Sequence, residues 1–158
     1  MSGPLLLAVE SSCDETGIAL VEGGRRIHAN VVASQVALHS ATGGIVPEVA
    51  ARAHLRWMIP VLDEARQRAG LVDWSELDAV AVTEGPGLAG SLLVGITMAK
   101  TLAWSQGLPL VPVNHLEGHL YSNWLDTERL GQPPPIKFPT LSLIVSGGHT
   151  ELVLMRSH

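Results

Sequence analysis

The sequence predicts an α/β domain built on a mixed β-sheet flanked by helices. Two observations carry this prediction. Three short apolar segments separated by polar turns come first, and helical and strand patterns then alternate along the chain. A packed core is feasible because 46% of the 158 residues are hydrophobic and 16% are charged. Aromatic residues make up only 4%, so the core must consist mainly of Val, Leu, Ile and Ala.

The first three strands are expected at Leu5–Glu10, Gly17–Glu22 and Arg26–Ala33. Gly23 and Gly24 mark a tight turn between the second and the third. Connections this short join neighbouring antiparallel strands, so we expect these three to form one side of the sheet.

A long helix is expected after Gly44. Its apolar positions recur at steps of three and four residues, which places them on one face of the helix. These positions are Val46, Val49, Ala53, Trp57, Val61 and Ala65. We expect Pro60 to kink the helix and Gly70 to end it.

Strands and helices alternate after Gly70. The expected elements are a strand at Leu77–Thr83, a helix at Leu88–Ser105, a strand at Leu110–Val113 and a helix from His115 to about Leu125. Asn114 is a suitable N-cap for the last of these helices.

The end of the sequence predicts a separate unit. Gly131–Pro139 holds four prolines and is expected to be a linker. Two further strands are expected at Leu141–Val145 and Leu152–Met155, and an isolated hairpin is only marginally stable in water. We therefore expect a first lobe over residues 1–130, a linker over 131–139, and the start of an incomplete second lobe over 140–158.

Charge and cysteine content limit the classes of function. The formal net charge is −5 without any run of like charges, so the chain lacks a basic footprint for nucleic acid. Cys13 is the only cysteine, which excludes an internal disulfide and suits a reducing compartment. There is no signal-peptide pattern and no apolar run of about 20 residues. We expect a cytoplasmic protein that does not enter a membrane.

His115 and His119 are the strongest candidates for chemistry. Residues four apart on a helix leave from the same face, so the two imidazoles can bind one metal ion. Glu117 lies two residues after the first histidine, whereas the zincin pattern has glutamate directly after it. Two solvated or capping histidines remain the alternative, since metal sites need three or four protein ligands.

Three glycine-rich or polar turns are weaker candidates. The turn within Glu10–Gly17 can hold phosphate through its backbone N–H groups, and Asp14 or Glu15 can position a metal or act on a proton; the alternative is an ordinary hairpin turn. The segment Gly85–Gly90 matches the dinucleotide pattern but lacks the acidic residue that follows it, which leaves close helix packing or an anion site. Ser146–Thr150 is either a phosphate-binding turn or a plain hairpin turn.

The order of these motifs resembles the TsaD family, the tRNA threonylcarbamoyladenosine transferases once described as O-sialoglycoprotein endopeptidases. The matching segments run along the whole chain. They are Glu10–Gly17, GGIVPEVAARAHL at Gly43–Leu55, TEGPGLAGSLLVG at Thr83–Gly95, NHLEGH at Asn114–His119 and VSGGHT at Val145–Thr150.

The resemblance implies a two-lobed actin/Hsp70/sugar-kinase-like (ASKHA) fold, of which this chain would carry the N-terminal lobe and the first two strands of a truncated second lobe. It also implies one divalent metal ion, iron or zinc, held by His115, His119 and an aspartate of the second lobe. Glu15 matches an acid associated with activity. Ile144, Val145, Ser146, Gly147 and Gly148 match the loop that binds the substrate.

The implied reaction transfers the threonylcarbamoyl group from threonylcarbamoyl-AMP to N6 of the adenosine beside the anticodon of tRNAs that read ANN codons. The implied partners are tRNA and proteins of the TsaB, TsaE and TsaC types, and the complete protein would bind an ATP- or AMP-type nucleotide. Family members are about twice as long as this chain. We therefore expect the 158 residues alone to be inactive, and to bind metal and nucleotide weakly if at all.

The sequence also allows three alternative functions. A metallopeptidase would use the two histidines but lacks a general base placed as in zincins. A TsaB-like scaffold without catalysis would bind its partner, or a second copy of itself, through the helix at Pro47–Ala69. A relative that transfers a carbamoyl group would share the same lobe.

Overall fold

The computed structural model describes residues 3–126, 135–146 and 150–158. Five strands form the main sheet: β1 (Leu5–Glu10), β2 (Glu15–Glu22), β3 (Arg26–Ser34), β4 (Ala79–Gly85) and β5 (Leu110–Asn114). A second sheet pairs β6 (Thr140–Val145) with β7 (Thr150–Met155). The helices are α1 (Val36–His39), α2 (Pro47–Ala69), α3 (Ala89–Gln106) and α4 (His115–Tyr121), with 3₁₀ turns η1 (Ser40–Thr42), η2 (Trp74–Glu76) and η3 (Ser122–Trp124).

The main sheet has the strand order β3-β2-β1-β4-β5. β1, β2 and β3 pair antiparallel, whereas β4 lies parallel to both β1 and β5. The predicted mixed sheet is therefore confirmed. Since β1, β4 and β5 run the same way, their carboxyl ends meet at one edge, which is where α/β sheets commonly place ligands.

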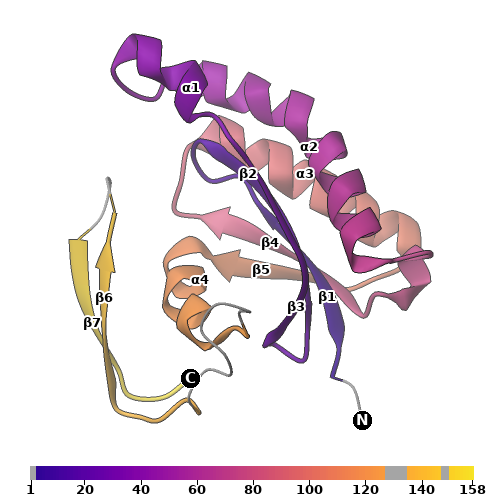
Figure 1. The fold of residues 1–158 in the computed structure, drawn as a ribbon, viewed down its shortest axis with the longest axis vertical. Coiled ribbons are helices and arrows are strands. Elements are labelled where there is room, and N and C mark those ends of the chain that lie inside the picture. The colour runs from indigo at the N-terminus through magenta and orange to yellow at the C-terminus, as the bar shows by residue number, and fades with distance from the viewer. Residues whose placement is uncertain (1–2, 127–134, 147–149) are drawn as a thin grey trace.

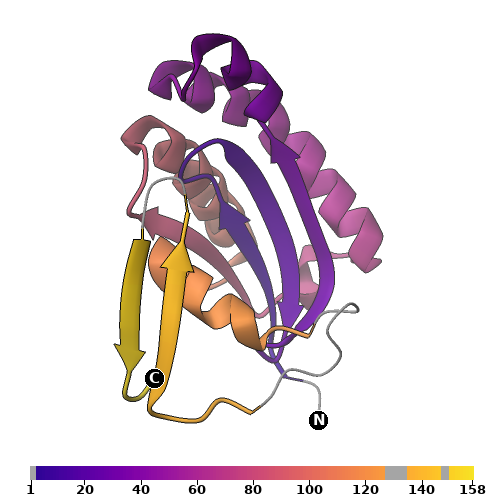
Figure 2. The same cartoon turned by 60° about the vertical axis from the view of Figure 1, so that its left-hand side comes forward.

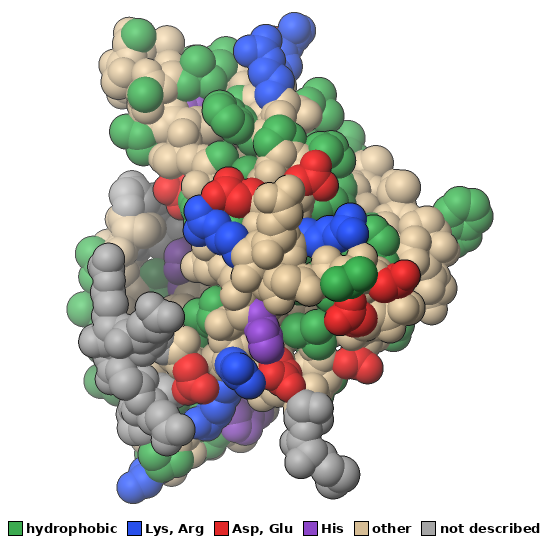
Figure 3. Space-filling model, turned by 45° about the vertical axis from the view of Figure 1, so that its right-hand side comes forward, with side chains coloured by type: hydrophobic (Ala, Val, Ile, Leu, Met, Phe, Trp, Pro, Cys, Tyr) green, Lys and Arg blue, Asp and Glu red, His purple; other side chains and the backbone are tan. Residues whose placement is uncertain are grey.

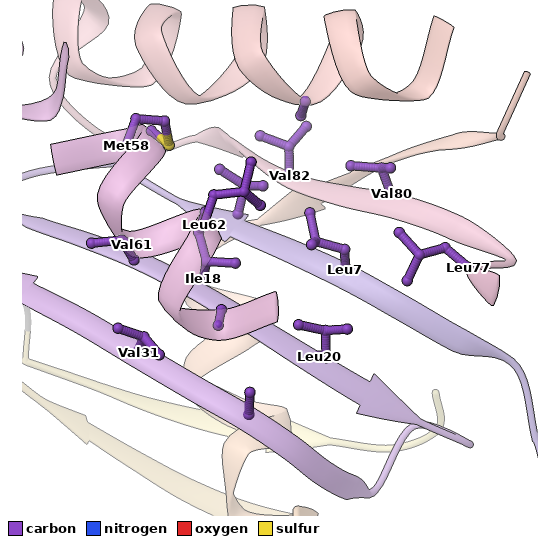
Figure 4. Close-up of a cluster of buried hydrophobic side chains, with 14 of the residues drawn as sticks. Leu7, Ile18, Leu20, Val31, Met58, Val61, Leu62, Leu77, Val80 and Val82 are labelled. Carbon is purple, nitrogen blue, oxygen red and sulfur yellow. The ribbon is translucent and has the colours of Figure 1, made fainter. Parts of the chain in front are cut away.

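Two helices cover one face of this sheet. Figures 1 and 2 show α2 and α3 side by side against it, with α4 and the β6–β7 hairpin on the opposite side. The core between α2, α3 and the strands is aliphatic, as the composition predicted (Figure 4). Its central members include Leu7, Ile18, Leu20, Met58, Val61 and Val80, all at most 3% exposed.

The buried face of α2 differs from the predicted face. Ala53, Val61 and Ala65 are buried as expected, but Val46, Val49 and Trp57 are 36%, 37% and 46% exposed. Four other residues complete the buried stripe: Ala50, His54, Met58 and Leu62. Apolar spacing alone was misleading here because α2 carries hydrophobic side chains on both flanks, and β2, β3 and α3 cover only one of them. The helix continues through Pro60, whose exposed position lets water reach the carbonyl that loses its partner.

Glycines let α3 lie close to the strand ends. A Cβ atom at Gly95 would come within 2.3 Å of Ser11 Oγ, and one at Gly87 within 2.6 Å of the Ser12 carbonyl oxygen. Ser91, in the first turn of α3, is fully buried, and its carbonyl accepts a hydrogen bond from Ser11 Oγ at 2.8 Å. These contacts support close helix packing as the role of the Gly85–Gly90 segment.

α4 begins where the sequence predicts and ends earlier. The Asn114 side chain accepts a hydrogen bond from the Leu116 N–H at 2.9 Å, which confirms the N-cap. The helix ends at Tyr121, because η3 tightens the chain there, and does not extend to Leu125. Other boundaries also differ: β2 starts at Glu15, and β4 runs from Ala79 to Gly85. The short helix α1 was not predicted.

The β6–β7 hairpin packs one face on α4. Leu120, Trp124, Ile144 and Met155 form a second, smaller hydrophobic cluster between them. The opposite face of the hairpin is apolar and exposed. It consists of Leu141, Leu143, Val145, Leu152 and Leu154, each at least 52% exposed.

The surface carries mixed charge. Figure 3 shows acidic and basic side chains interspersed on one face of the molecule, with hydrophobic side chains among them. Within the described ranges, no helix has the length and apolar character needed to cross a membrane.

Candidate metal centre

The two histidines meet at the carboxyl edge of the sheet. The end of β5 leads directly into α4, whose first residue is His115, and His119 follows one turn later. Their Nε2 atoms are 3.0 Å apart, and the rings lie edge to face with centroids 4.4 Å apart. The predicted pairing on one helix face is therefore present. His115 is partly buried and His119 is exposed.

The other nitrogen of His115 is held by the first strand. Its Nδ1 lies 3.2 Å from Glu10 Oε2 and 3.2 Å from Ser12 Oγ. Glu10 is the last residue of β1, and Ser12 lies in the turn after it. A hydrogen on Nδ1 directed at the carboxylate leaves the lone pair on Nε2, the atom that faces His119.

The Glu10 carboxylate is itself fixed by neighbours. Thr83 Oγ1, near the end of β4, donates to Oε2 at 2.5 Å, and the Ser12 backbone N–H donates to Oε1. Burial acts to raise the pKa of Glu10, but the hydrogen bonds from Ser12, Thr83 and His115 outweigh it and place that pKa below its ordinary value. The carboxylate is therefore ionised at neutral pH.

This donor set fits half of a metal site. Two nitrogens bound at about 2.1 Å to a tetrahedral zinc ion lie about 3.4 Å apart, close to the observed 3.0 Å separation of the Nε2 atoms. A carboxylate on the distal nitrogen is the usual support of a metal-binding histidine. Among residues 3–126, 135–146 and 150–158, no three His, Cys, Asp or Glu side chains lie close enough together to hold a metal ion between them.

The remaining predicted site residues lie at the start of β2 and at the end of β6. Glu15 is exposed at the start of β2, three residues after Ser12. Ile144 is buried against α4, so only its backbone can face a ligand, whereas Val145 and Ser146 are exposed. Gly147 and Gly148 lie outside the described residues.

Sequence analysis missed Glu10 and His54. Glu10 lies in the polar motif at the carboxyl end of β1, which marks it as a residue of the sheet edge but does not reveal that it contacts His115. His54 is fully buried in α2, where Nδ1 lies 2.8 Å from Thr16 Oγ1 and Nε2 lies 3.1 Å from the Cys13 carbonyl oxygen. These two contacts tie α2 to the turn between β1 and β2.

Cys13 is not activated as a nucleophile. Burial, followed by the negative charge of Asp14, raises the pKa of its thiol, which disfavours the thiolate.

Comparison with known proteins decides the family. The family model described as TsaD, tRNA N6-adenosine threonylcarbamoyltransferase, matches residues 26–158. The chain belongs to the TsaD family. A tRNA N6-adenosine threonylcarbamoyltransferase of Thermomicrobium roseum is 57% identical over 98% of this chain, and that of Symbiobacterium thermophilum is 54% identical over 100% of this chain. The chain spans only 42% and 44% of these two TsaD-family relatives.

Solved structures confirm the fold. YeaZ from Pseudomonas aeruginosa matches 70% of this TsaD-family chain with a TM-score of 0.51 at 22% identity, covering 43% of YeaZ. A crystal structure of an uncharacterized protein with similarity to peptidase YeaZ, from the same organism, matches 95% of the chain and 63% of its own length, with a TM-score of 0.55 at 20% identity. These two likenesses show that the chain shares the mixed α/β fold of both proteins.

The family assignment also bears on the alternative functions. The curated relatives at 50–57% identity carry the transferase name, so neither a metallopeptidase nor a TsaB-like scaffold is favoured. The geometry also argues against a metallopeptidase. Glu117 is exposed on α4, two residues from each histidine, so its side chain leaves the helix on a different side from theirs.

Proposed function

We propose that this chain forms one wall of the active cleft of a tRNA N6-adenosine threonylcarbamoyltransferase. The enzyme would transfer the threonylcarbamoyl group from threonylcarbamoyl-AMP to N6 of the adenosine beside the anticodon, in tRNAs that read ANN codons, within the cytoplasm. The observation that carries the proposal is the His115–His119 pair, in a chain whose TsaD-family match covers residues 26–158.

The two histidines would hold one divalent ion, iron or zinc, and an acidic residue of a second lobe would complete its coordination. Such an ion, when bound, polarises a carbonyl or phosphate oxygen of the substrate. The residues of this chain supply the rest. Glu10 orients His115, and His115 with His119 presents two nitrogens at the edge of the sheet.

Substrate binding is proposed for the turn after β6 and the turn after β1. Val145 and Ser146 are exposed at the end of β6, so their backbone groups are accessible to the acyl-adenylate. Glu15 is exposed beyond the turn that contacts His115, where its carboxylate can meet the amino or hydroxyl groups of a substrate. An ATP- or AMP-type nucleotide would occupy the cleft between this lobe and the second one.

The apolar face of the β6–β7 hairpin is exposed in this chain, which suggests that another part of the protein covers it. Five aliphatic side chains on one face of a two-stranded sheet are costly to leave in water, and a two-stranded sheet is marginal by itself. We propose that a second lobe covers this face, since the TsaD relatives are more than twice as long as the part that this chain matches.

Helix α2 is the proposed contact for a TsaB-type protein or for a second copy of the chain. Leu55 and Ile59, one turn apart, are 67% and 56% exposed, which is unusual for side chains of this size on a surface helix. TsaE-type proteins would join the same assembly.

The test is reconstitution of the modification. The full-length protein is combined with TsaB-, TsaE- and TsaC-type partners, ATP, threonine, bicarbonate and unmodified tRNA, and the nucleosides are analysed by mass spectrometry. We expect threonylcarbamoyladenosine with the wild type and only background with His115→Ala or His119→Ala. His28→Ala, a surface histidine paired with Glu22, is the matched control and should retain activity. Absence of the modified nucleoside in the complete wild-type mixture would contradict the proposal.

A further inference from the structure

Glu10 is the residue that links the parallel strands to the histidine pair. It ends β1, its Oε2 accepts from Thr83 near the end of β4 at 2.5 Å, and the same oxygen lies 3.2 Å from His115 Nδ1 after β5. One carboxylate oxygen therefore joins the ends of three adjacent strands.

The arrangement selects one form of the imidazole. An ionised carboxylate only accepts hydrogen bonds, so the Nδ1 that faces it must carry the hydrogen. Nε2 of the neutral ring then carries the lone pair, and Nε2 is the atom 3.0 Å from His119 Nε2. The opposite tautomer would direct a hydrogen at the position where an ion must bind.

We propose that Glu10 is a positioning residue that fixes the Nδ1–H tautomer and the ring orientation of His115, with Thr83 and the Ser12 backbone holding the carboxylate in place. The inference rests on the metal site proposed above. It adds a specific claim, namely that the affinity of the His115–His119 pair for a metal ion depends on a carboxylate that does not touch the ion. Residues in this supporting position typically change metal affinity by about 10- to 100-fold.

A second carboxylate–imidazole pair provides a matched control. His28 Nε2 lies 2.9 Å from Glu22 Oε2, on β2 and β3 at the opposite end of the strands from the candidate site. Glu22→Gln therefore removes the same kind of charge from the same kind of partner without touching the site.

The experiment measures Zn²⁺ affinity of the full-length protein by competition with a chromophoric chelator. We expect Glu10→Gln to weaken Zn²⁺ binding by about 10- to 100-fold. Thr83→Val, which removes the hydroxyl and keeps the side-chain shape, should weaken binding by a smaller factor, and Glu22→Gln should leave it unchanged. Since Thr83→Val keeps the charge, it tests the proposal even if Glu10→Gln does not fold.

A spectroscopic reading separates positioning from a merely structural role. In zinc-free protein labelled with ¹⁵N-histidine, we expect the His115 resonance to report the Nδ1–H tautomer in the wild type and a shift toward Nε2–H in Glu10→Gln. If the wild type takes up no Zn²⁺, or if His115→Ala binds it as well as the wild type, the proposed metal site and this inference both fail. If His115→Ala abolishes binding while Glu10→Gln and Thr83→Val bind like the wild type, the inference alone is overturned.

Discussion

Replacing the buried His54 with leucine should destabilise the protein by about 2–6 kcal/mol. The side chain is 0% exposed, and its two ring nitrogens pair with the Thr16 hydroxyl at 2.8 Å and the Cys13 carbonyl at 3.1 Å. Leucine is similar in size, so it keeps the space filled. It leaves two polar groups without these partners, at about 1–3 kcal/mol each.

The pH dependence of stability provides an independent measure of the same residue. Burial lowers the pKa of His54, although the Cys13 carbonyl and the charges of Glu10 and Asp14 oppose this. In the folded protein the ring is therefore neutral at pH values where the unfolded chain already binds a proton. The contribution of His54 is fully present above its unfolded pKa of about 6.5 and declines as the pH falls below that value.

The assay is urea unfolding followed by far-UV circular dichroism between pH 5 and pH 8. The wild type should gain stability as the pH rises toward about 6.5, and His54→Leu should lose that part of the slope. His28→Leu is the control, because His28 is partly exposed and pairs with Glu22, so its loss should change stability by less than about 1 kcal/mol. If His54→Leu is no more destabilising than His28→Leu, the assigned hydrogen bonds do not hold the turn.

Three further predictions concern packing and association. Gly87→Ala places a Cβ atom 2.6 Å from the Ser12 carbonyl oxygen, so it should lower the free energy of unfolding by about 1–3 kcal/mol in thermal unfolding. In the same assay Gly118→Ala, whose Cβ has nothing within 4 Å, should raise it by up to about 1 kcal/mol. Leu120→Ala removes the α4 side chain beneath the hairpin, so the β6–β7 amides should exchange with solvent faster by about tenfold or more, which an unchanged exchange rate would contradict. Leu55→Glu should weaken dimerisation or TsaB binding in light scattering with size-exclusion chromatography, and Trp104→Glu, which is 86% exposed at the end of α3, should not.

The order of elements could be predicted because local patterns determine it. Apolar runs between polar turns predicted β1, β2 and β3. Gly70 ends α2 as expected, in the left-handed conformation, and Gly107 ends α3 in the same way. Boundaries at α4 and β4 were less accurate, since the last turn of a helix and the first residues of a strand depend on what packs against them.

The candidate site could be predicted only in part. A spacing of four residues is enough to place His115 and His119 on one helix face, and Asn114 marks where that helix begins. The role of Glu10 could not be read in this way, because it lies 105 positions before His115 in the sequence. Ile144 stays a predicted substrate-binding residue, and since its side chain packs in the cluster beneath the hairpin, only its backbone is available for that role.

The sequence by itself determined which segments form helices and strands, and which two imidazoles share a face, since both follow from periodicity over a few residues. The tertiary structure decided which flank of α2 is buried, and it brought Glu10, Thr83 and His115 together. The physical reason is the parallel register of β1, β4 and β5, which aligns their carboxyl ends at one edge. A hydrogen-bonded carboxylate thus comes to lie behind a histidine that local sequence could only place on a helix.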